Sequence, residues 1–160
     1  YTIPAKVVAA APAISAWLAG NVDAPVLIGP DAESEQWVSQ VAAGAQCPFI
    51  VLEKKRHGDH NVEVSVPDPG ALRGRTPVLI DDIISTARTM IAATERIVSG
   101  GLGQPVCVGV HAIFAGTAYD DLLRAGASRI VTCNSVPHPT NVIDIHPAIA
   151  QQIDEMLRSD

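Results

Sequence analysis

The sequence has few basic residues, few cysteines and no long apolar run. It contains 11 Lys and Arg residues and 17 Asp and Glu residues, which give a net charge of −6. Broad nucleic-acid binding needs a basic face that collects phosphates, so this balance argues against it. No apolar stretch approaches the length that crosses a bilayer, and the N-terminal residues lack a charged-then-apolar secretion signal. We therefore expect a cytoplasmic protein whose partners include neither a nucleic acid nor a membrane.

The three cysteines, Cys47, Cys107 and Cys133, stand far apart in the sequence. The last two lie within or at the end of apolar runs, which is typical of buried reduced thiols rather than of a disulfide frame or a zinc site. An apolar content of 48% is too high for a disordered chain, and 160 residues are enough for one domain with a buried core.

Apolar runs alternate with helical patterns along most of the chain. Strands are predicted at 24–29, 48–52, 61–66, 78–80, 105–113 and 129–133, with an additional edge strand at 142–145. A short helical pattern is present before Gly20, and helices are predicted at 34–43, 87–99, 117–125 and 147–157. In the helix at 34–43, Trp37, Val38 and Val41 have the spacing of a core-facing stripe. This alternation predicts an α/β fold with a mainly parallel, twisted sheet and helices on both of its faces.

One stretch combines a buried strand with polar groups suited to a ligand. The apolar run Val78–Ile80 is followed by Asp81 and Asp82 at the carboxyl end, where open α/β sheets bind ligands. Ser85 and Thr86 are favoured helix-start residues, so hydroxyls and free backbone N–H groups would converge there and suit a phosphate. Together they describe a site for a phosphorylated sugar. Each half also has a simpler explanation, because strand-end acids are commonly just solvated and Ser-Thr commonly only caps a helix.

The most charged segment is Glu53–Asn61, with the sequence EKKRHGDHN. It has no periodicity, so we expect a mobile loop there. By themselves, Lys54, Lys55 and Arg56 are more typical of a solvated turn than of a site. A loop that folds over the sheet would nevertheless bring these cations onto a reacting polyphosphate, whose transfer depends on positioned positive charge.

The stretch around the acid pair resembles the ribose-phosphate loop of the type I phosphoribosyltransferase fold: apolar residues, two acids, two apolar residues, a small residue and Thr-x-x-Thr. The resemblance implies that Asp81 and Asp82 contact the ribose 2- and 3-hydroxyls and that the following turn wraps the 5-phosphate. Ala87 and Arg88 depart from the glycine-containing pair that is usual in the family. The turn residues that would bind the phosphate are Ser85, Thr86, Ala87, Arg88 and Thr89.

A narrower resemblance covers residues 26 to about 153. The pattern from Leu52 to Val64 is similar to the catalytic flexible loop of ribose-phosphate pyrophosphokinases, also called phosphoribosyl pyrophosphate synthetases. It implies that Lys54 and Arg56 stabilise the transition state and that Lys55 is accessory. Three further motifs carry the resemblance: GPD at 29–31, HAIFAG at 111–116 and VTCNS at 131–135.

In that family the acid of the first motif helps to bind magnesium-ATP, which implies Asp31 as a metal-binding residue and Mg²⁺ as the cofactor. The following residues, Ala32 to Glu35, depart from the small or glycine pair that is usual there. The implied reaction moves the diphosphoryl group of Mg-ATP to the 1-hydroxyl of ribose 5-phosphate, giving phosphoribosyl pyrophosphate and AMP. ATP and ribose 5-phosphate are then the ligands, and identical chains are the expected partners in an oligomer.

Enzymes of this family consist of two similar α/β domains, and the chain resembles only the second. We therefore expect residues 1–20 to be a linker from a missing N-terminal domain, residues 21–160 to form the phosphoribosyltransferase-like domain, and the domain alone to be inactive. Two alternatives stay open: a phosphoribosyltransferase that acts on a nucleobase, and a non-catalytic relative that binds phosphoribosyl ligands and regulates a partner. His111 by itself is more typical of a hydrogen-bonded core residue than of a catalytic group.

Overall fold

A six-stranded sheet forms the centre of the molecule. The computed structural model describes residues 5–57, 61–65 and 73–158, and for residues 53–57 and 61–65 it describes the backbone only. The strand order is β2-β1-β5-β6-β7-β8, and each neighbouring pair is parallel. These strands are β1 (Pro25–Gly29), β2 (Phe49–Val51), β5 (Thr76–Ile84), β6 (Val106–Ala112), β7 (Arg129–Cys133) and β8 (Asn141–Ile143). The predicted α/β fold with a mainly parallel sheet is confirmed.

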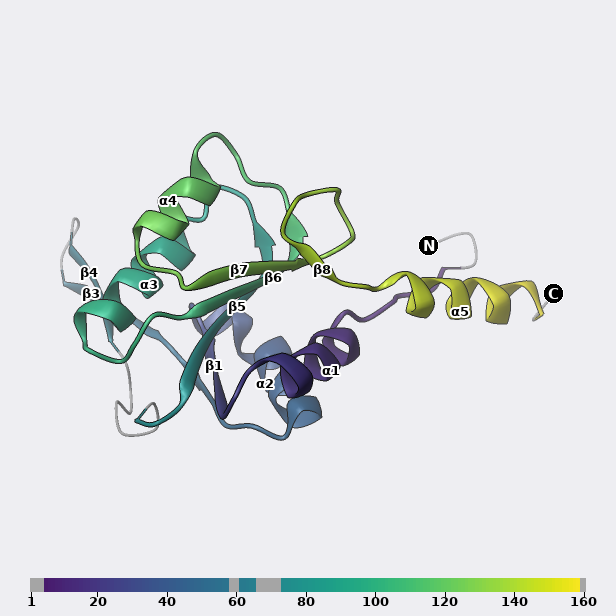
Figure 1. The fold of residues 1–160 in the computed structure, drawn as a ribbon, viewed down its shortest axis with the longest axis horizontal. Coiled ribbons are helices and arrows are strands. Elements are labelled where there is room, and N and C mark those ends of the chain that lie inside the picture. Colours follow the sequence, from purple (N-terminus) through teal and green to yellow (C-terminus); the bar gives the residue numbers. More distant parts are fainter. Residues whose placement is uncertain (1–4, 58–60, 66–72, 159–160) are drawn as a thin grey trace.

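Helices cover both faces of this sheet (Figure 1). Helices α1 (Ala11–Asn21) and α2 (Glu35–Ala45) lie on one face, and α3 (Arg88–Ser99) and α4 (Ala118–Arg124) lie on the other. The helix α5 (His146–Leu157) projects from the body of the domain and buries none of its residues. In the part of the chain that the structure describes, no helix combines the length and the apolar character needed to cross a membrane.

Strand β5 is the central element because it is apolar on both sides. Val78, Leu79 and Ile80 are fully buried. Val78 and Ile80 belong to the cluster on the α1 and α2 side, whereas Leu79 belongs to the cluster on the α3 and α4 side. A continuous apolar run is what a parallel strand covered on both faces requires. The strand continues through the acid pair to Ile84, so these acids lie in its last part rather than beyond its end.

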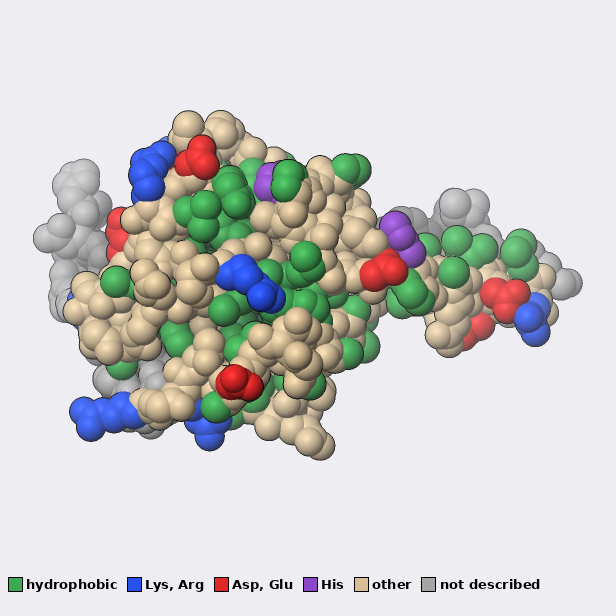
Figure 2. Space-filling model, viewed as in Figure 1, with side chains coloured by type: hydrophobic (Ala, Val, Ile, Leu, Met, Phe, Trp, Pro, Cys, Tyr) green, Lys and Arg blue, Asp and Glu red, His purple; other side chains and the backbone are tan. Residues whose placement is uncertain are grey.

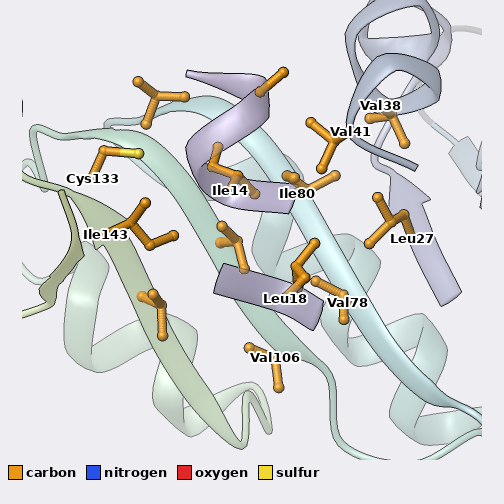
Figure 3. Packing of buried hydrophobic residues seen from close by; sticks show 14 of the residues in the cluster. Ile14, Leu18, Leu27, Val38, Val41, Val78, Ile80, Val106, Cys133 and Ile143 are labelled. Carbon is orange, nitrogen blue, oxygen red and sulfur yellow. The ribbon is translucent and has the colours of Figure 1, made fainter. Parts of the chain in front are cut away.

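Helix α1 packs into the core of the same domain. Ile14 and Leu18 are fully buried, and Figure 3 shows both side chains directed toward the layer that contains Val78 and Ile80. The short helical pattern predicted before Gly20 is therefore confirmed, and this part of the expected linker is packed on the sheet. A preceding domain stays a prediction.

The packing of α1 can be tested by truncating one of its buried side chains. Leu18→Ala is expected to lower the free energy of unfolding by about 2–5 kcal/mol, because it removes apolar contacts and leaves a cavity. Urea denaturation followed by circular dichroism measures the change. Leu157→Ala makes the same chemical change at a side chain that is 73% exposed, and it should alter stability by less than about 0.5 kcal/mol. Equal effects of the two substitutions would mean that α1 does not stabilise the domain.

The charged segment after β2 forms a strand, and the loop predicted there is wrong for its first part. Strand β3 (Glu53–His57) pairs with β4 (Asn61–Ser65) in a separate antiparallel sheet. In this hairpin Lys54 stands opposite Val64 and Arg56 stands opposite Val62. Strand β3 forms because its backbone pairs with β4. Its charged side chains have no alternating pattern, so the sequence gives no sign of the strand. The strand predicted at 61–66 is confirmed.

The cysteines behave as the sequence predicts. Cys107 and Cys133 are buried and unpaired, and Cys47 is half-buried and also unpaired. Burial raises the pKa of Cys107 to about 12 and that of Cys133 to about 11. Because the thiolate is the reactive form, these two thiols are expected to be inert at neutral pH.

Candidate functional site

The carboxyl ends of β1 and β5 enclose a small cavity of about 150 Å³, which we call the acidic cup. Asp81 is half-buried and Asp82 is exposed. The structure brings both together with Asp31, which is distant in sequence and was predicted from a different motif. Six residues line the acidic cup: Asp31, Glu33, Ser34, Trp37, Asp81 and Asp82.

The electrostatics of the acidic cup centre on Asp81. Burial raises the pKa of Asp81 from 3.8 to about 6; the backbone N–H of Asp82, which donates to Asp81 Oδ1 at 3.0 Å, opposes this, and the charges of Asp82 and Asp31 add to it. A raised pKa means that the folded protein is less stable when Asp81 is ionised than when it is protonated. Clustered carboxylates of this kind favour a ligand that brings hydroxyl donors or a cation.

This pKa predicts how Asp81→Asn changes stability with pH. The folded protein binds the Asp81 proton more tightly than the unfolded chain, so stability falls as pH rises from about 4 to about 6. Asp81→Asn removes that loss and is expected to stabilise the domain at neutral pH by about 1–2 kcal/mol, a value reduced for solvent screening. At a pH of about 4 the gain should disappear.

Urea denaturation at the two pH values measures this effect. Asp23→Asn, at an exposed aspartate before β1, is the matched control and should change little at either pH. A loss of stability in Asp81→Asn at neutral pH would show that the Asp81 carboxylate is stabilising and would contradict the assignment.

The loop after β1 positions Asp31 through a close backbone approach. The hydroxyl of Ser34, at the end of the short helix η1 (Ala32–Ser34), donates to the carbonyl oxygen of Asp31 at 2.6 Å. A Cβ atom at Gly29 would overlap the Ser34 hydroxyl, so a side chain there would displace the hydroxyl from its bond to Asp31. This geometry holds Asp31 at the rim of the acidic cup although the following residues depart from the usual motif.

The turn after β5 leads into an uncapped helix. The N-cap of α3 is Ala87, and no described side chain caps the helix. The simpler alternative, in which Ser85 and Thr86 only cap this helix, is therefore wrong. Ser85 is half-buried and Thr86 is exposed in the turn. The first N–H groups of α3 have no intrahelical partner, and they carry the positive end of the helix dipole. Such an N-terminus is suited to bind a phosphate.

Ala87 occupies a backbone conformation that glycine usually takes. Its φ is +56°, in the left-handed region, and its side chain is buried. An alanine there costs about 1 kcal/mol relative to glycine, which the packing around the turn must offset. Ala87 therefore keeps the left-handed conformation of the turn, although the glycine that is usual in the family is absent. The exposed side chain of Arg88, the first residue of α3, places a cation beside it.

A second loop supports this turn from the neighbouring strand. The backbone N–H groups of Ile113 and Phe114 both donate to the carbonyl oxygen of Ile84, at 3.1 and 2.9 Å. The N–H of Ala115 donates to the carbonyl oxygen of Ser85 at 3.0 Å. These bonds tie the start of the turn before α3 to the HAIFAG motif. The motif was noted in the sequence, but its residues gave no sign of this supporting role.

The charged hairpin of β3 and β4 starts at the carboxyl end of β1, next to the acidic cup. The N–H of Leu52, the residue before β3, donates to the carbonyl oxygen of Gly29 at 2.9 Å. Since Gly29 ends β1 and Asp31 follows closely, the hairpin begins beside the acidic cup. The side chains of Lys54 and Arg56 lie outside the described part of the chain, so their catalytic role stays a prediction.

A wider opening, which we call the side cavity, adjoins the acidic cup. It has a volume of about 570 Å³, and Glu33, Trp37 and Asp82 line both spaces. The sequence pattern predicts Trp37 as a core residue, whereas the side chain is only half-buried and lies between the two cavities. No described residue accepts a hydrogen bond from its buried indole N–H. His111 also lines the side cavity, and its Nδ1 lies 2.9 Å from Ser135 Oγ.

The carboxylates of the acidic cup fit a magnesium ion that also binds a polyphosphate. Across the side chains that the structure describes, no group of three or more His, Cys, Asp or Glu residues is arranged to hold a metal ion. Magnesium does not need such a cage, because it commonly binds one or two carboxylates, several waters and the phosphates of its substrate. Asp31, at the rim of the acidic cup, is suited to this kind of site.

Comparisons with known proteins found matches over most of the chain. A family model described as the phosphoribosyl transferase domain matches residues 4–152. The ribose-phosphate pyrophosphokinase of Sulfurisphaera tokodaii is 32% identical over 147 residues, which cover 89% of this chain and 50% of the relative. That of Methanopyrus kandleri is 30% identical over 158 residues, covering 98% of this chain and 54% of the relative. The chain spans about half the length of the curated relatives that it matches.

A solved structure shows the same fold. The crystal structure of phosphoribosylpyrophosphate synthetase from Mycobacterium smegmatis superimposes with a TM-score of 0.73 and 21% identity. The match covers 94% of this chain and 50% of that chain. At this identity the likeness establishes the fold, and the phosphoribosyltransferase-like architecture predicted from the sequence is confirmed.

Proposed function

Because this chain belongs to the phosphoribosyl transferase domain family and is similar to ribose-phosphate pyrophosphokinases, we propose that it is the ribose 5-phosphate-binding domain of such an enzyme. The reaction would transfer the diphosphoryl group of ATP to the 1-hydroxyl of ribose 5-phosphate. The products would be phosphoribosyl pyrophosphate and AMP.

The observation that carries this proposal is the sequence of groups along β5 and α3. Asp81 and Asp82 offer carboxylate oxygens to the ribose 2- and 3-hydroxyls, and such charge-assisted hydrogen bonds are stronger than neutral ones. The uncapped start of α3, next to the left-handed Ala87, offers N–H groups to the 5-phosphate. One continuous segment thus presents acceptors and donors in the order in which a pentose phosphate carries hydroxyls and phosphate, which would fix the 1-hydroxyl for attack.

Asp31 would help to hold Mg²⁺ with the phosphates of ATP. A polyphosphate approaching the acidic cup meets Glu33, Asp81 and Asp82, so its negative charge must be offset. A bound magnesium ion supplies that neutralisation and polarises the phosphoryl oxygens. Asp31 would act as a carboxylate ligand, and the side chain of Arg88 would add positive charge on the sugar-phosphate side.

Lys54 and Arg56 would neutralise the charge of the transferred group. They are two residues apart on β3, and positions two apart on a strand belong to the same face of it. The hydrogen bond between Leu52 and Gly29 supports this role because it starts the hairpin beside the acidic cup. Positioned cations of this kind stabilise the charge that spreads over a transferred phosphoryl group.

Further protein would complete the enzyme. The chain spans about half the length of its curated relatives. The projecting helix α5 supports a partner at that place, since Ile153 is 53% and Leu157 is 73% exposed. Figure 2 shows apolar side chains uncovered along the projection. We propose that a second α/β half, or an identical subunit, packs there and supplies the rest of the ATP site.

An assay of AMP formation tests the proposed function. The longer protein that contains this domain should form AMP and phosphoribosyl pyrophosphate in equal amounts from ATP and ribose 5-phosphate when Mg²⁺ is present. Release of pyrophosphate from phosphoribosyl pyrophosphate that depends on a nucleobase would instead identify a phosphoribosyltransferase. Binding of ribose 5-phosphate without any turnover in the longer protein would identify a non-catalytic relative.

A further inference from the structure

The hydrogen bonds around His111 define which of its ring nitrogens carries a proton. The hydroxyl of Ser135 donates to the carbonyl oxygen of Val110 at 2.7 Å. A hydroxyl has one hydrogen, so Ser135 Oγ can only accept from His111 Nδ1, which lies 2.9 Å away. His111 Nδ1 therefore bears the proton. In the neutral ring, Nε2 is then the nitrogen with a free lone pair.

His111 lines the side cavity, which adjoins the acidic cup. The ring is half-buried, and its Nδ1 edge is occupied by Ser135. His111 pairs in register with Ile83 on β5, the residue after Asp82. His111 and Asp82 line the same side cavity. A proton acceptor thus lines the same cavity as Asp82, one of the two acids to which the ribose hydroxyls are assigned.

We propose that His111 is a catalytic residue whose Nε2 accepts the proton of the 1-hydroxyl of ribose 5-phosphate, an inference that rests on the proposed function. The hydroxyl oxygen attacks the β-phosphorus of ATP and forms a new oxygen–phosphorus bond. The bond between that phosphorus and the oxygen bridging to the α-phosphate breaks, and AMP leaves with the electron pair. The hydroxyl proton passes to His111 Nε2, so charge and atoms balance.

The other groups that line the side cavity are less suited to this task. Glu33 and Asp82 are carboxylates, which are weaker bases than an imidazole, and Asp82 is assigned to the ribose. Histidine is the side chain that most often accepts a proton from a reacting group in enzymes. Ser135 acts as a positioning residue, because its bond to Val110 fixes the tautomer of His111.

Nitrogen-15 NMR of the histidine rings tests the tautomer without any turnover. Two-bond proton–nitrogen spectra of the labelled chain should show His111 protonated at Nδ1, with its signals identified by their loss in His111→Gln. His138 is an internal control of the opposite kind, because its Nδ1 accepts the backbone N–H of Thr140 at 3.3 Å. His138 should therefore be protonated at Nε2. Protonation of neutral His111 at Nε2 would overturn the proposal.

Two ligands then separate this inference from the proposed function. Ribose 5-phosphate should shift the Nε2 signal of His111 and leave that of His138 unchanged. The analogue 1,4-anhydroribitol 5-phosphate, which lacks the 1-hydroxyl, should bind but leave His111 Nε2 unchanged. If both ligands bind and neither shifts Nε2, or both shift it equally, His111 does not contact the 1-hydroxyl. If neither binds in calorimetry, the proposed function fails and this assignment fails with it.

Kinetics of the longer protein complete the test. His111→Gln is expected to lower kcat by about 100- to 10,000-fold, the usual range for a general base, with little change in the KM for ribose 5-phosphate. Ser135→Ala should lower kcat less, because the ring keeps Nε2 but loses its fixed tautomer. An unchanged kcat in His111→Gln, in a variant with normal unfolding behaviour, would overturn the role.

Discussion

Replacing Asp81 and Asp82 together by asparagine is expected to weaken ribose 5-phosphate binding by about 100- to 20,000-fold. Each carboxylate accepts a hydrogen bond from a ribose hydroxyl in the proposed complex, and hydrogen bonds to charged groups are worth about 1.5–3 kcal/mol each. Two such losses sum to about 3–6 kcal/mol, which corresponds to that range in Kd. Isothermal titration calorimetry on the chain measures the change.

A loss of folding would not explain such a result. The pKa of Asp81, raised to about 6 by burial, means that the asparagine at this position should stabilise the domain at neutral pH. The variant should therefore unfold at the same or higher urea concentration while it binds more weakly. Asp23→Asn, which changes an exposed aspartate outside the acidic cup, should bind normally. Equal affinities of the wild type and the double variant would remove the acid pair from the site.

In the complete enzyme that we propose, replacing Lys54 and Arg56 together by alanine is expected to lower turnover by about 1,000-fold or more. Cations that meet a transferred phosphoryl group are worth about 10³- to 10⁵-fold in rate, because they stabilise charge present mainly in the transition state. Binding of ribose 5-phosphate should stay nearly unchanged, since the acidic cup and the turn before α3 hold the sugar. A discontinuous assay of AMP formation measures kcat, and calorimetry measures the affinity.

The matched control for this pair replaces two exposed cations elsewhere. Arg73 lies before the amino-terminal end of β5, whereas the acidic cup lies at the carboxyl end of this strand, and Arg124 is the last residue of α4. Arg73→Ala combined with Arg124→Ala removes the same total charge and should leave kcat within about twofold, as expected for surface substitutions away from a site. Equal activity of the Lys54 and Arg56 variant and the wild type would refute the role of the hairpin cations.

The fold could be predicted from sequence where burial leaves a clear pattern. The run Val78–Ile80 identifies a strand covered on both sides, and the alternation of strands and helices identifies a parallel sheet. The hairpin strand Glu53–His57 could not be identified in this way, because its pairing with β4 depends on backbone hydrogen bonds and its charged side chains have no periodicity. Helix α1 gave a visible pattern, but only the packing of Ile14 and Leu18 assigns it to the core.

The site was predictable in part for the same reason. Asp31, Asp81 and Asp82 follow apolar runs, so their meeting at the carboxyl ends of β1 and β5 is what neighbouring parallel strands lead us to expect. The left-handed conformation of Ala87 and the hydrogen bonds of His111 depend on contacts between residues that are distant in sequence. A lone histidine at the end of an apolar run carries no sign of which nitrogen is free.

Calorimetric titration of the chain with ribose 5-phosphate is the most direct test of a single site for a pentose phosphate. We predict one saturable binding event at a ratio of one ligand to one chain. Ribose and inorganic phosphate, each titrated alone, should bind far more weakly, because each meets only half of the site. Absence of any heat with ribose 5-phosphate, or equal binding of inorganic phosphate alone, would contradict the account.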